Sequence, residues 1–256
     1  MTDVIKTETG TKFRLTNNWK DENQGIFTTK SVEIPANQIT CLIGCNGIGK
    51  TTAIEEMKQF LESTGAREVT DLQEYNPMAG FFDSLREDKD KKKPTAYIVY
   101  FDKDKTFIKN KGQGGQSWGF DHDIARICGN NSSNGESVIM RLNGAIEAIG
   151  IFIKKSIKEQ VPLWIFIDDV DAGTSIDVIA EVKANLIQAS EYLNKHNLEH
   201  YIVVTSNSFE FAKDMYCLYA RTMKPIEVTD YEKYKKFVLK SRKDKEKRDG
   251  IHTNAQ

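Results

Sequence analysis

Several features that define other protein classes are missing from this chain of 256 residues. It has no run approaching the roughly 20 consecutive apolar residues of a membrane-spanning helix. Its first residues do not form the charged and then apolar leader of a secreted protein. The formal net charge of −1 argues against a globally basic nucleic-acid-binding protein. We therefore expect a cytoplasmic protein without membrane insertion.

Cysteine is also scarce, and its spacing excludes the common paired motifs. The four cysteines, Cys41, Cys45, Cys128 and Cys217, form no CxxC pair. Scattered cysteines of this kind are typical of reduced thiols in a cytosolic protein. The length fits one large α/β domain, and we expect it to span residues 1–240. Residues 241–256 are basic and poor in apolar side chains, so we expect a frayed tail there.

A glycine-rich segment is the most informative feature that is present. It reads Gly44-Cys45-Asn46-Gly47-Ile48-Gly49-Lys50-Thr51-Thr52, between an apolar run at 39–43 and a helix-like stretch at 53–61. Strand, glycine loop and helix in this order are typical of a P-loop, whose backbone N–H groups surround phosphate oxygens. Lys50 is then expected to reach the β- and γ-phosphates, and the Thr51 hydroxyl to bind Mg²⁺. The segment predicts nucleotide binding.

Apolar patterns along the rest of the chain predict strands alternating with helices. Continuous apolar runs at 96–101, 163–167 and 201–205 are typical of buried parallel strands. Apolar residues at helical spacing predict helices over 138–153 and 176–193. Two shorter strands are expected at 12–18 and 26–34. The alternation indicates an α/β fold with a mostly parallel sheet flanked by helices.

The strand predicted at 163–167 ends in two acids, Asp168 and Asp169. A carboxylate at the carboxyl end of a strand can hold the hydration shell of Mg²⁺, and the next can orient or deprotonate the attacking water. Acids after a strand also cap helices. Downstream of a P-loop, we favour the nucleotide role for both.

A third motif, Ser132-Ser133-Asn134-Gly135-Glu136, precedes the long helix predicted from residue 138. Taken alone, it is an ordinary helix start. Together the three segments resemble the ATP-binding-cassette (ABC) class, whose P-loop commonly reads G-x-N-G-x-G-K-[ST]-T and whose signature reads LSGGQ or LSGGE. Ser133, Gly135 and Glu136 match the signature, whereas Ser132 replaces its leucine and Asn134 a glycine.

The resemblance implies further parts of the fold and of the site. It implies an ABC-type head with a small antiparallel β region at its start and a helical signature subdomain at roughly 103–160. It also implies a homodimer in which Ser133 and Gly135 of one subunit face the γ-phosphate held by the other, so that two ATP molecules lie in the interface. An aromatic residue stacks on adenine in such proteins; Trp19 is the candidate, and a surface role for it is equally compatible with the sequence.

Two details resemble the SMC and RecF branch more than a transporter subunit. The interval from Gly135 to Asp168 is long, and Asp168-Asp169-Val170-Asp171-Ala172 resembles the D-E-V-D-A of SMC proteins. SMC proteins insert a long coiled coil between P-loop and signature, but the interval from 53 to 128 has no sustained heptads. The resemblance therefore implies a stand-alone head.

Three positions depart from the family pattern. Asp169 stands where most active cassettes have glutamate, and its shorter side chain is expected to slow hydrolysis by as much as about 100-fold. Ser206 stands in the place of the switch histidine. Asp102 occupies the most plausible place of the glutamine that contacts Mg²⁺, with Gln113 and Gln116 as weaker candidates.

Thr174-Ser175-Ile176-Asp177 resembles the family's S-x-L-D loop, which makes Asp177 a candidate at the dimer interface. The function predicted from the whole pattern is an ATPase that binds ATP and Mg²⁺, turns over slowly, dimerises and signals to a partner such as DNA or a DNA-processing protein. The alternatives are the nucleotide-binding subunit of a membrane transporter and a nucleotide-gated binding module with negligible turnover.

Overall fold

The chain forms two β-sheets in the computed structural model, which describes residues 5–7, 10–15, 25–68, 93–101, 149–171 and 173–250. The first sheet is antiparallel, in the order β1–β2–β3, and comprises β1 (Ile5–Thr7), β2 (Gly10–Arg14) and β3 (Ser31–Pro35). This sheet confirms the small antiparallel region that the sequence predicts near the start of the chain.

The second sheet has seven strands in the order β10–β9–β4–β8–β7–β6–β5. All neighbouring pairs are parallel except the edge pair of β9 and β10. This sheet confirms the predicted mostly parallel architecture. The strands are β4 (Gln38–Ile43), β5 (Arg67–Glu68), β6 (Tyr97–Phe101), β7 (Leu163–Ile167), β8 (His200–Ser206), β9 (Tyr216–Tyr219) and β10 (Lys224–Ile226).

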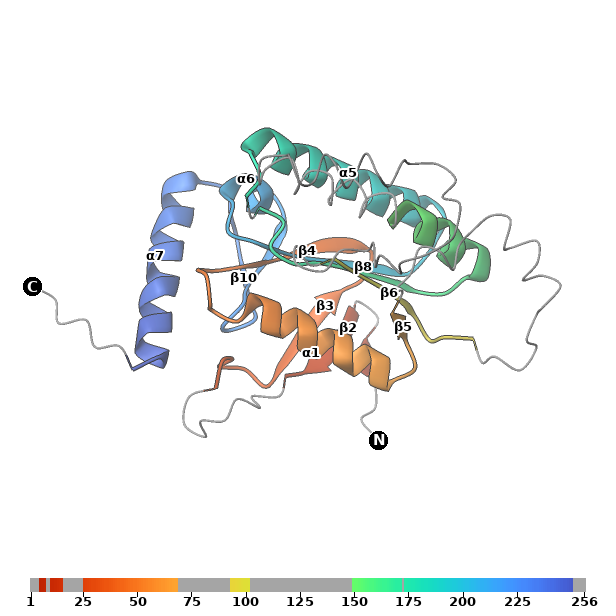
Figure 1. Cartoon of the computed structure of the whole chain (residues 1–256), viewed down its shortest axis with the longest axis horizontal. Coiled ribbons are helices and arrows are strands. Elements are labelled where there is room, and N and C mark those ends of the chain that lie inside the picture. Colours follow the sequence, from red (N-terminus) through yellow and green to blue (C-terminus); the bar gives the residue numbers. More distant parts are fainter. Residues whose placement is uncertain are drawn as a thin grey trace, which may run out of the picture.

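Helices cover both faces of the large sheet, as Figure 1 shows. One face is covered by α1 (Lys50–Ser63) together with the small sheet, and the other by a helical segment at 149–159, α5 (Ile176–Lys195) and the short α6 (Phe209–Ala212). The last helix, α7 (Tyr231–Arg248), lies at one end of the sheet, where its Tyr234, Phe237 and Val238 pack against the same core as α5. Among the helices that the structure describes, none combines the length and apolar content needed to cross a bilayer.

Each face of the sheet has its own apolar core, because successive side chains of a strand point to opposite faces. In β4, Cys41 and Ile43 pack in the core under α5, whereas Leu42 packs in the core shared with α1. On that second face, the Trp164 ring lies 3.8 Å from the Tyr201 ring and 5.3 Å from the Phe13 ring of the small sheet. Because Trp164 and Tyr201 both belong to the large sheet, it is the contact between Phe13 and Trp164 that joins the small sheet to the large one.

Strand order decides which loops meet at the carboxyl edge of the sheet. Because β8 lies between β4 and β7, the residues after β8 stand between the glycine loop and the acids after β7. Ligands of open α/β sheets commonly bind outside this edge. The edge is also where α7 lies (Figure 1).

Candidate functional site

The loop between β4 and α1 has the glycines that a tight anion-binding turn needs. At Gly49, the residue that caps α1, the backbone is left-handed with φ 112°, and an added Cβ would lie 2.3 Å from Ile26 Cγ2. At Gly47, φ is 74° and an added Cβ would lie 2.7 Å from Lys245 Cε. A side chain at either position would be strained by the left-handed backbone. At Gly49 it would also clash with Ile26, whereas at Gly47 it would displace only the flexible end of Lys245. The requirement for glycine is therefore conformational and steric.

The N-terminus of α1 is open to an anion. Gly49 supplies no side-chain cap, and the first turn of the helix has no acidic residue. The N–H groups and the partial positive charge of such a turn favour a negatively charged ligand. Thr51, the predicted Mg²⁺ ligand, is the second residue of this turn and is exposed. The donor set therefore fits a phosphate group.

Lys50 is the buried cation of the site. Its Nζ donates to the carbonyls of Gly44 at 3.1 Å and Cys45 at 3.3 Å, and to Asn207 Oδ1 at 2.7 Å. Burial lowers the pKa of Lys50, while Asp169, Asp171 and Asp168 act to raise it. All its hydrogen-bond acceptors are neutral, so the charge is held close to the loop and remains available to an anion.

Asp168 is buried directly after β7, as a metal-binding carboxylate at the end of a strand would be. Its Oδ1 accepts a hydrogen bond of 2.5 Å from the Thr205 hydroxyl of the neighbouring strand β8. The same hydroxyl accepts the N–H of Asp169 at 2.6 Å. Thr205 thus fixes the first acid by its side chain and the second by its backbone.

Asp169 has a left-handed backbone, with φ 57°. This conformation is uncommon for a residue other than glycine, although aspartate and asparagine tolerate it best. A strained residue maintained by its surroundings points to a functional position. The next residue, Val170, is buried in the core and still donates its N–H to the Thr205 carbonyl at 3.2 Å.

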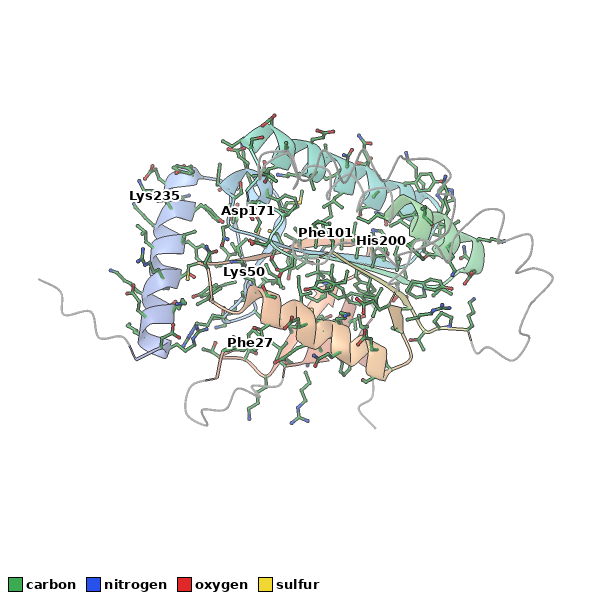
Figure 2. All side chains as sticks on the ribbon, in the orientation of Figure 1. Phe27, Lys50, Phe101, Asp171, His200 and Lys235 are labelled. Carbon is green, nitrogen blue, oxygen red and sulfur yellow. The ribbon has the colours of Figure 1, made fainter. Side chains whose placement is uncertain are left out.

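Asn207, which the sequence analysis did not select, joins the two halves of the site. Its side-chain oxygen accepts from Lys50, its Nδ2 donates to Asn46 Oδ1 at 2.6 Å, and its backbone N–H donates to the two Asp171 carboxylate oxygens at 2.9 and 3.1 Å. Burial raises the pKa of Asp171. Figure 2 shows Lys50 and Asp171 at the same end of the sheet.

Ser206, predicted at the switch position, is fully buried and accepts a hydrogen bond from the N–H of Ser208 at 2.9 Å. Asp177 lies in the first turn of α5 and is exposed. A hydrogen bond from Ser175 lowers its pKa. The roles of Ser206 and Asp177 stay predictions.

Four predicted site residues lie outside the described residues: Trp19, Asp102, Ser133 and Gly135. The adenine contact, one Mg²⁺ contact and the signature motif therefore stay predictions. Within the part of the chain that the structure describes, no cluster of three or more histidine, cysteine or acidic residues could hold a metal ion. A Mg²⁺ ion held by one or two protein groups and by phosphate oxygens needs no such cluster.

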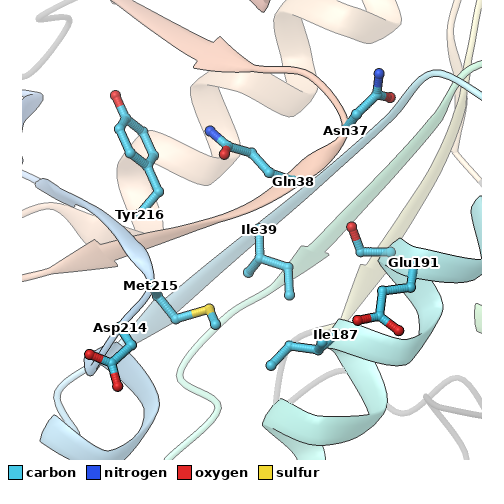
Figure 3. Close-up of a pocket in the computed structure, with 9 residues that line it drawn as sticks. Asn37, Gln38, Ile39, Ile187, Glu191, Asp214, Met215 and Tyr216 are labelled. Atoms are coloured by element: carbon cyan, nitrogen blue, oxygen red, sulfur yellow. The ribbon is translucent and has the colours of Figure 1, made fainter. Parts of the chain in front are cut away.

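A separate pocket of about 240 Å³ opens at the amino end of β4, as Figure 3 shows. It is lined by Gln38 and Ile39 of β4, by Ile187 and Glu191 of α5, and by Met215 before β9. This pocket is at the end of β4 opposite to the glycine loop. It therefore belongs to no part of the predicted phosphate site.

Comparison with known proteins finds similar solved structures but no matching protein family. No protein-family model matches the sequence, and no curated protein matches it. One similar solved structure is an ATP-binding subunit of an ABC transporter, with 12% identity and a TM-score of 0.36, and 92% of each chain is covered.

A second similar structure is a nucleotide-free ATP-binding cassette from an ABC transporter. Its identity is 11% and its TM-score 0.41, with 87% of this chain and 92% of that chain covered. Identities and TM-scores of this size carry no argument about function. The function of this chain has to be inferred from its own residues.

Proposed function

We propose that this chain is a Mg²⁺-dependent ATPase of the ABC type that binds ATP through the loop 44–52 and hydrolyses it slowly. The observation that carries the proposal is Lys50, a buried cation beside a glycine loop and an uncapped helix N-terminus. Neutral acceptors hold its ammonium group beside three aspartates after β7. A triphosphate with its metal supplies the negative and positive charges that complement this arrangement.

The residues after β7 fit the proposed hydrolysis. Asp168 would hold the Mg²⁺ hydration shell with Thr51, and Asp169 would orient or deprotonate the attacking water. Support comes from Thr205, which fixes the Asp168 carboxylate and the Asp169 backbone at hydrogen-bond distance. Because aspartate is one methylene shorter than the usual glutamate, we expect slow turnover.

The proposal includes a nucleotide-dependent homodimer. Its support is the order of the three sequence motifs, with Ser133 and Gly135 of one subunit completing the phosphate site of the other. An isologous arrangement of this kind buries the same surface on both subunits. The exposed position of Asp177 at the start of α5 is compatible with a contact across that interface.

The partner that we infer is DNA or a protein that works on DNA. The support for a direct DNA contact is α7, whose exposed residues include five lysines on one side and few acids. A row of lysines of this kind can bind the phosphate groups of DNA whatever the base sequence.

Lys50→Ala tests the nucleotide site, and we expect ATP affinity to fall about 100-fold or more. A charge-assisted contact contributes about 1.5–3 kcal/mol, and about 1.4 kcal/mol corresponds to tenfold in affinity. Isothermal titration of the purified protein with Mg²⁺ and ATP measures the change. Lys50→Met keeps most of the buried volume and should lose affinity to the same extent.

Lys58→Ala is the matched control, because Lys58 lies on the same helix and pairs with Glu68 at 2.7 Å instead of with the loop. Its ATP affinity should equal that of the wild type. Failure of the wild type to bind ATP, or binding by Lys50→Met within twofold of the wild type, would reject the proposed function.

A further inference from the structure

Helix α7 lies against the glycine loop, although roughly 200 residues of chain separate them (Figure 1). Ser241, Lys245 and Arg248 are four and three residues apart, which places them on one side of the helix. All three contact the segment 44–48. The contact surface is therefore one face of α7 and one side of the loop.

The contacts between the two are mainly hydrogen bonds to the loop backbone. The buried Ser241 Oγ accepts the N–H of Cys45 at 2.9 Å. Arg248 donates through Nη2 to the Gly47 carbonyl at 2.8 Å and through Nη1 to the Ile48 carbonyl at 3.4 Å. The Arg248 side chain is only 12% exposed. Two adjacent carbonyls thus share one guanidinium group.

The position of α7 along the loop is fixed by other contacts. The Tyr219 hydroxyl donates to Asp244 Oδ2 at 3.0 Å, and the Tyr219 ring packs edge-on against Phe237 at 5.1 Å. At the start of the helix, Asp230 caps the N–H of Lys233 at 2.8 Å. Ser241 and Arg248 are therefore presented to the loop by a helix that is anchored along its length.

The hydrogen bonds from α7 fix the orientation of individual peptide groups in the loop. In a trans peptide the C=O and the following N–H point in opposite directions. At the first peptide, the Gly44 carbonyl accepts from Lys50 while the Cys45 N–H points to Ser241. At the peptide between Gly47 and Ile48, the carbonyl accepts from Arg248, and the Ile48 N–H donates to the Cys45 carbonyl at 3.3 Å within the loop. At the next peptide, between Ile48 and Gly49, the carbonyl also points to Arg248, so the Gly49 N–H points away from that guanidinium group.

We propose that Arg248 and Ser241 are positioning residues of the phosphate site, which hold peptide groups of the loop so that the Gly49 N–H stays aimed at the ligand and the Gly44 carbonyl stays aimed at Lys50. The inference rests on the proposed nucleotide binding. A loop held in its binding conformation loses less conformational freedom when the ligand arrives, so its affinity is higher. Helix α7 is thereby a part of the nucleotide site.

Arginine suits this role better than lysine because its planar guanidinium presents several donors in a fixed fork. Arg248 uses two of them on the loop, while its Nε pairs with Asp249 Oδ1 at 2.8 Å. Asp249 also pairs with Lys245 Nζ at 3.0 Å. A lysine at position 248 could donate to one carbonyl but could not bridge both with a rigid group.

The test compares the affinities of Arg248→Ala, Arg248→Lys and Ser241→Ala for ATP with Mg²⁺ by isothermal titration. We expect about tenfold weaker binding for Arg248→Ala and about threefold for each of the other two, in line with loss of charged or neutral hydrogen bonds. In steady-state assays Arg248→Ala should raise KM with kcat unchanged. Arg242→Ala is the matched control, since Arg242 lies on α7, is 73% exposed and pairs with Glu246 only among the described residues.

The outcomes separate the two proposals. If the wild type binds ATP, Lys50→Met does not, and Arg248→Ala and Ser241→Ala bind within twofold of the wild type, then α7 has no positioning role and the nucleotide site stands. Weaker binding that follows only from a smaller folded fraction, measured by circular dichroism, would also overturn the positioning role. A wild type that does not bind ATP rejects both proposals.

Discussion

Asp169 combines a strained backbone with a predicted catalytic role. Its φ of 57° and the hydrogen bond from its N–H to the Thr205 hydroxyl fix the Asp169 backbone directly after β7. Neither observation depends on a nucleotide being bound. The backbone position is thus prepared by the fold, and the length of the side chain is left to set the rate of the proposed hydrolysis.

Asp169→Asn is expected to lower kcat about 100-fold while leaving the affinity for ATP unchanged. Asparagine accepts the left-handed backbone but cannot act as a base, and acid–base catalysis typically contributes about 10²–10⁴-fold. Phosphate release at saturating ATP measures the rate. Asp214→Asn is the control, because Asp214 has a similar φ of 60° on the turn before β9. Turnover unaffected by Asp169→Asn would remove this residue from the mechanism.

Not all residues of the site could be identified from the sequence. Lys50 and Asp168 belong to local patterns, a glycine loop before a helix and an acid after an apolar strand. Thr205 is the second-last residue of β8 and Asn207 follows that strand, but a threonine and an asparagine there are common polar residues with no motif of their own. Their contacts with Asp168 and Lys50 span 37 and 157 residues, so only the folded chain reveals them.

Among the elements, α7 differs most from what the sequence predicts. We expected a frayed tail from residue 241, whereas residues 241–248 continue the helix. The prediction relied on apolar side chains, which are scarce after Leu239. Beyond that point the helix is held instead by Ser241, Asp244 and Arg248 through hydrogen bonds to distant parts of the chain. A hydrophobic pattern contains no signal of such contacts.

The exposed side of α7 has a regular arrangement of charge. Its lysines alternate at spacings of three and four residues, which places them in one stripe along the helix, namely Lys233, Lys236, Lys240, Lys243 and Lys247. This stripe does not include Ser241 or Arg248. Charge on the stripe can therefore be changed without touching the contacts to the loop.

Reversing two lysines of the stripe, with Lys240→Glu and Lys243→Glu together, should weaken DNA binding and reduce its salt dependence. Each lost phosphate contact lowers the salt slope by about 1. Filter binding of a DNA duplex across a range of salt concentrations measures both. The control is Lys154→Glu with Lys158→Glu, an exposed pair on the helical segment 149–159. Equal affinities for the two double variants would exclude α7 from DNA contact.

At the scale of the whole molecule, the proposed site is incomplete in one chain. The loop 44–52 and the acids after β7 form one side, and the signature residues Ser133 and Gly135 of a second copy are proposed to form the other. We propose that such a half-site binds ATP and engages its partner only when the nucleotide is present. Nucleotide and oligomeric state should therefore change together.

Asp169→Asn should convert from monomer to dimer when ATP and Mg²⁺ are added, because it binds nucleotide and hydrolyses it more slowly. Light scattering coupled to size-exclusion chromatography measures the mass. ADP should give less dimer than ATP, and Lys50→Ala should remain monomeric with either nucleotide. A monomer at saturating ATP in the Asp169→Asn protein would contradict the proposed assembly.

The overall architecture could be predicted where strands are continuous apolar runs. The strand expected at 163–167 is β7, and the runs around 39–43, 96–101 and 201–205 correspond to β4, β6 and β8. The expected strand at 26–34 is in part wrong, since β3 comprises Ser31–Pro35 and the residues before it form bends. Sequence patterns give the strands but not their neighbours, because pairing depends on contacts far apart in the chain.

By itself the sequence determined the glycine loop, its lysine and the acid after β7, because each depends on the spacing of a few consecutive residues. Tertiary structure alone decided that β8 separates β4 from β7, which brings Asn207 to Lys50 and Thr205 to Asp168. It also decided that α7 supports the loop from outside. Those contacts join backbone groups to side chains from remote segments, and only the packing of the whole chain brings them within hydrogen-bond distance.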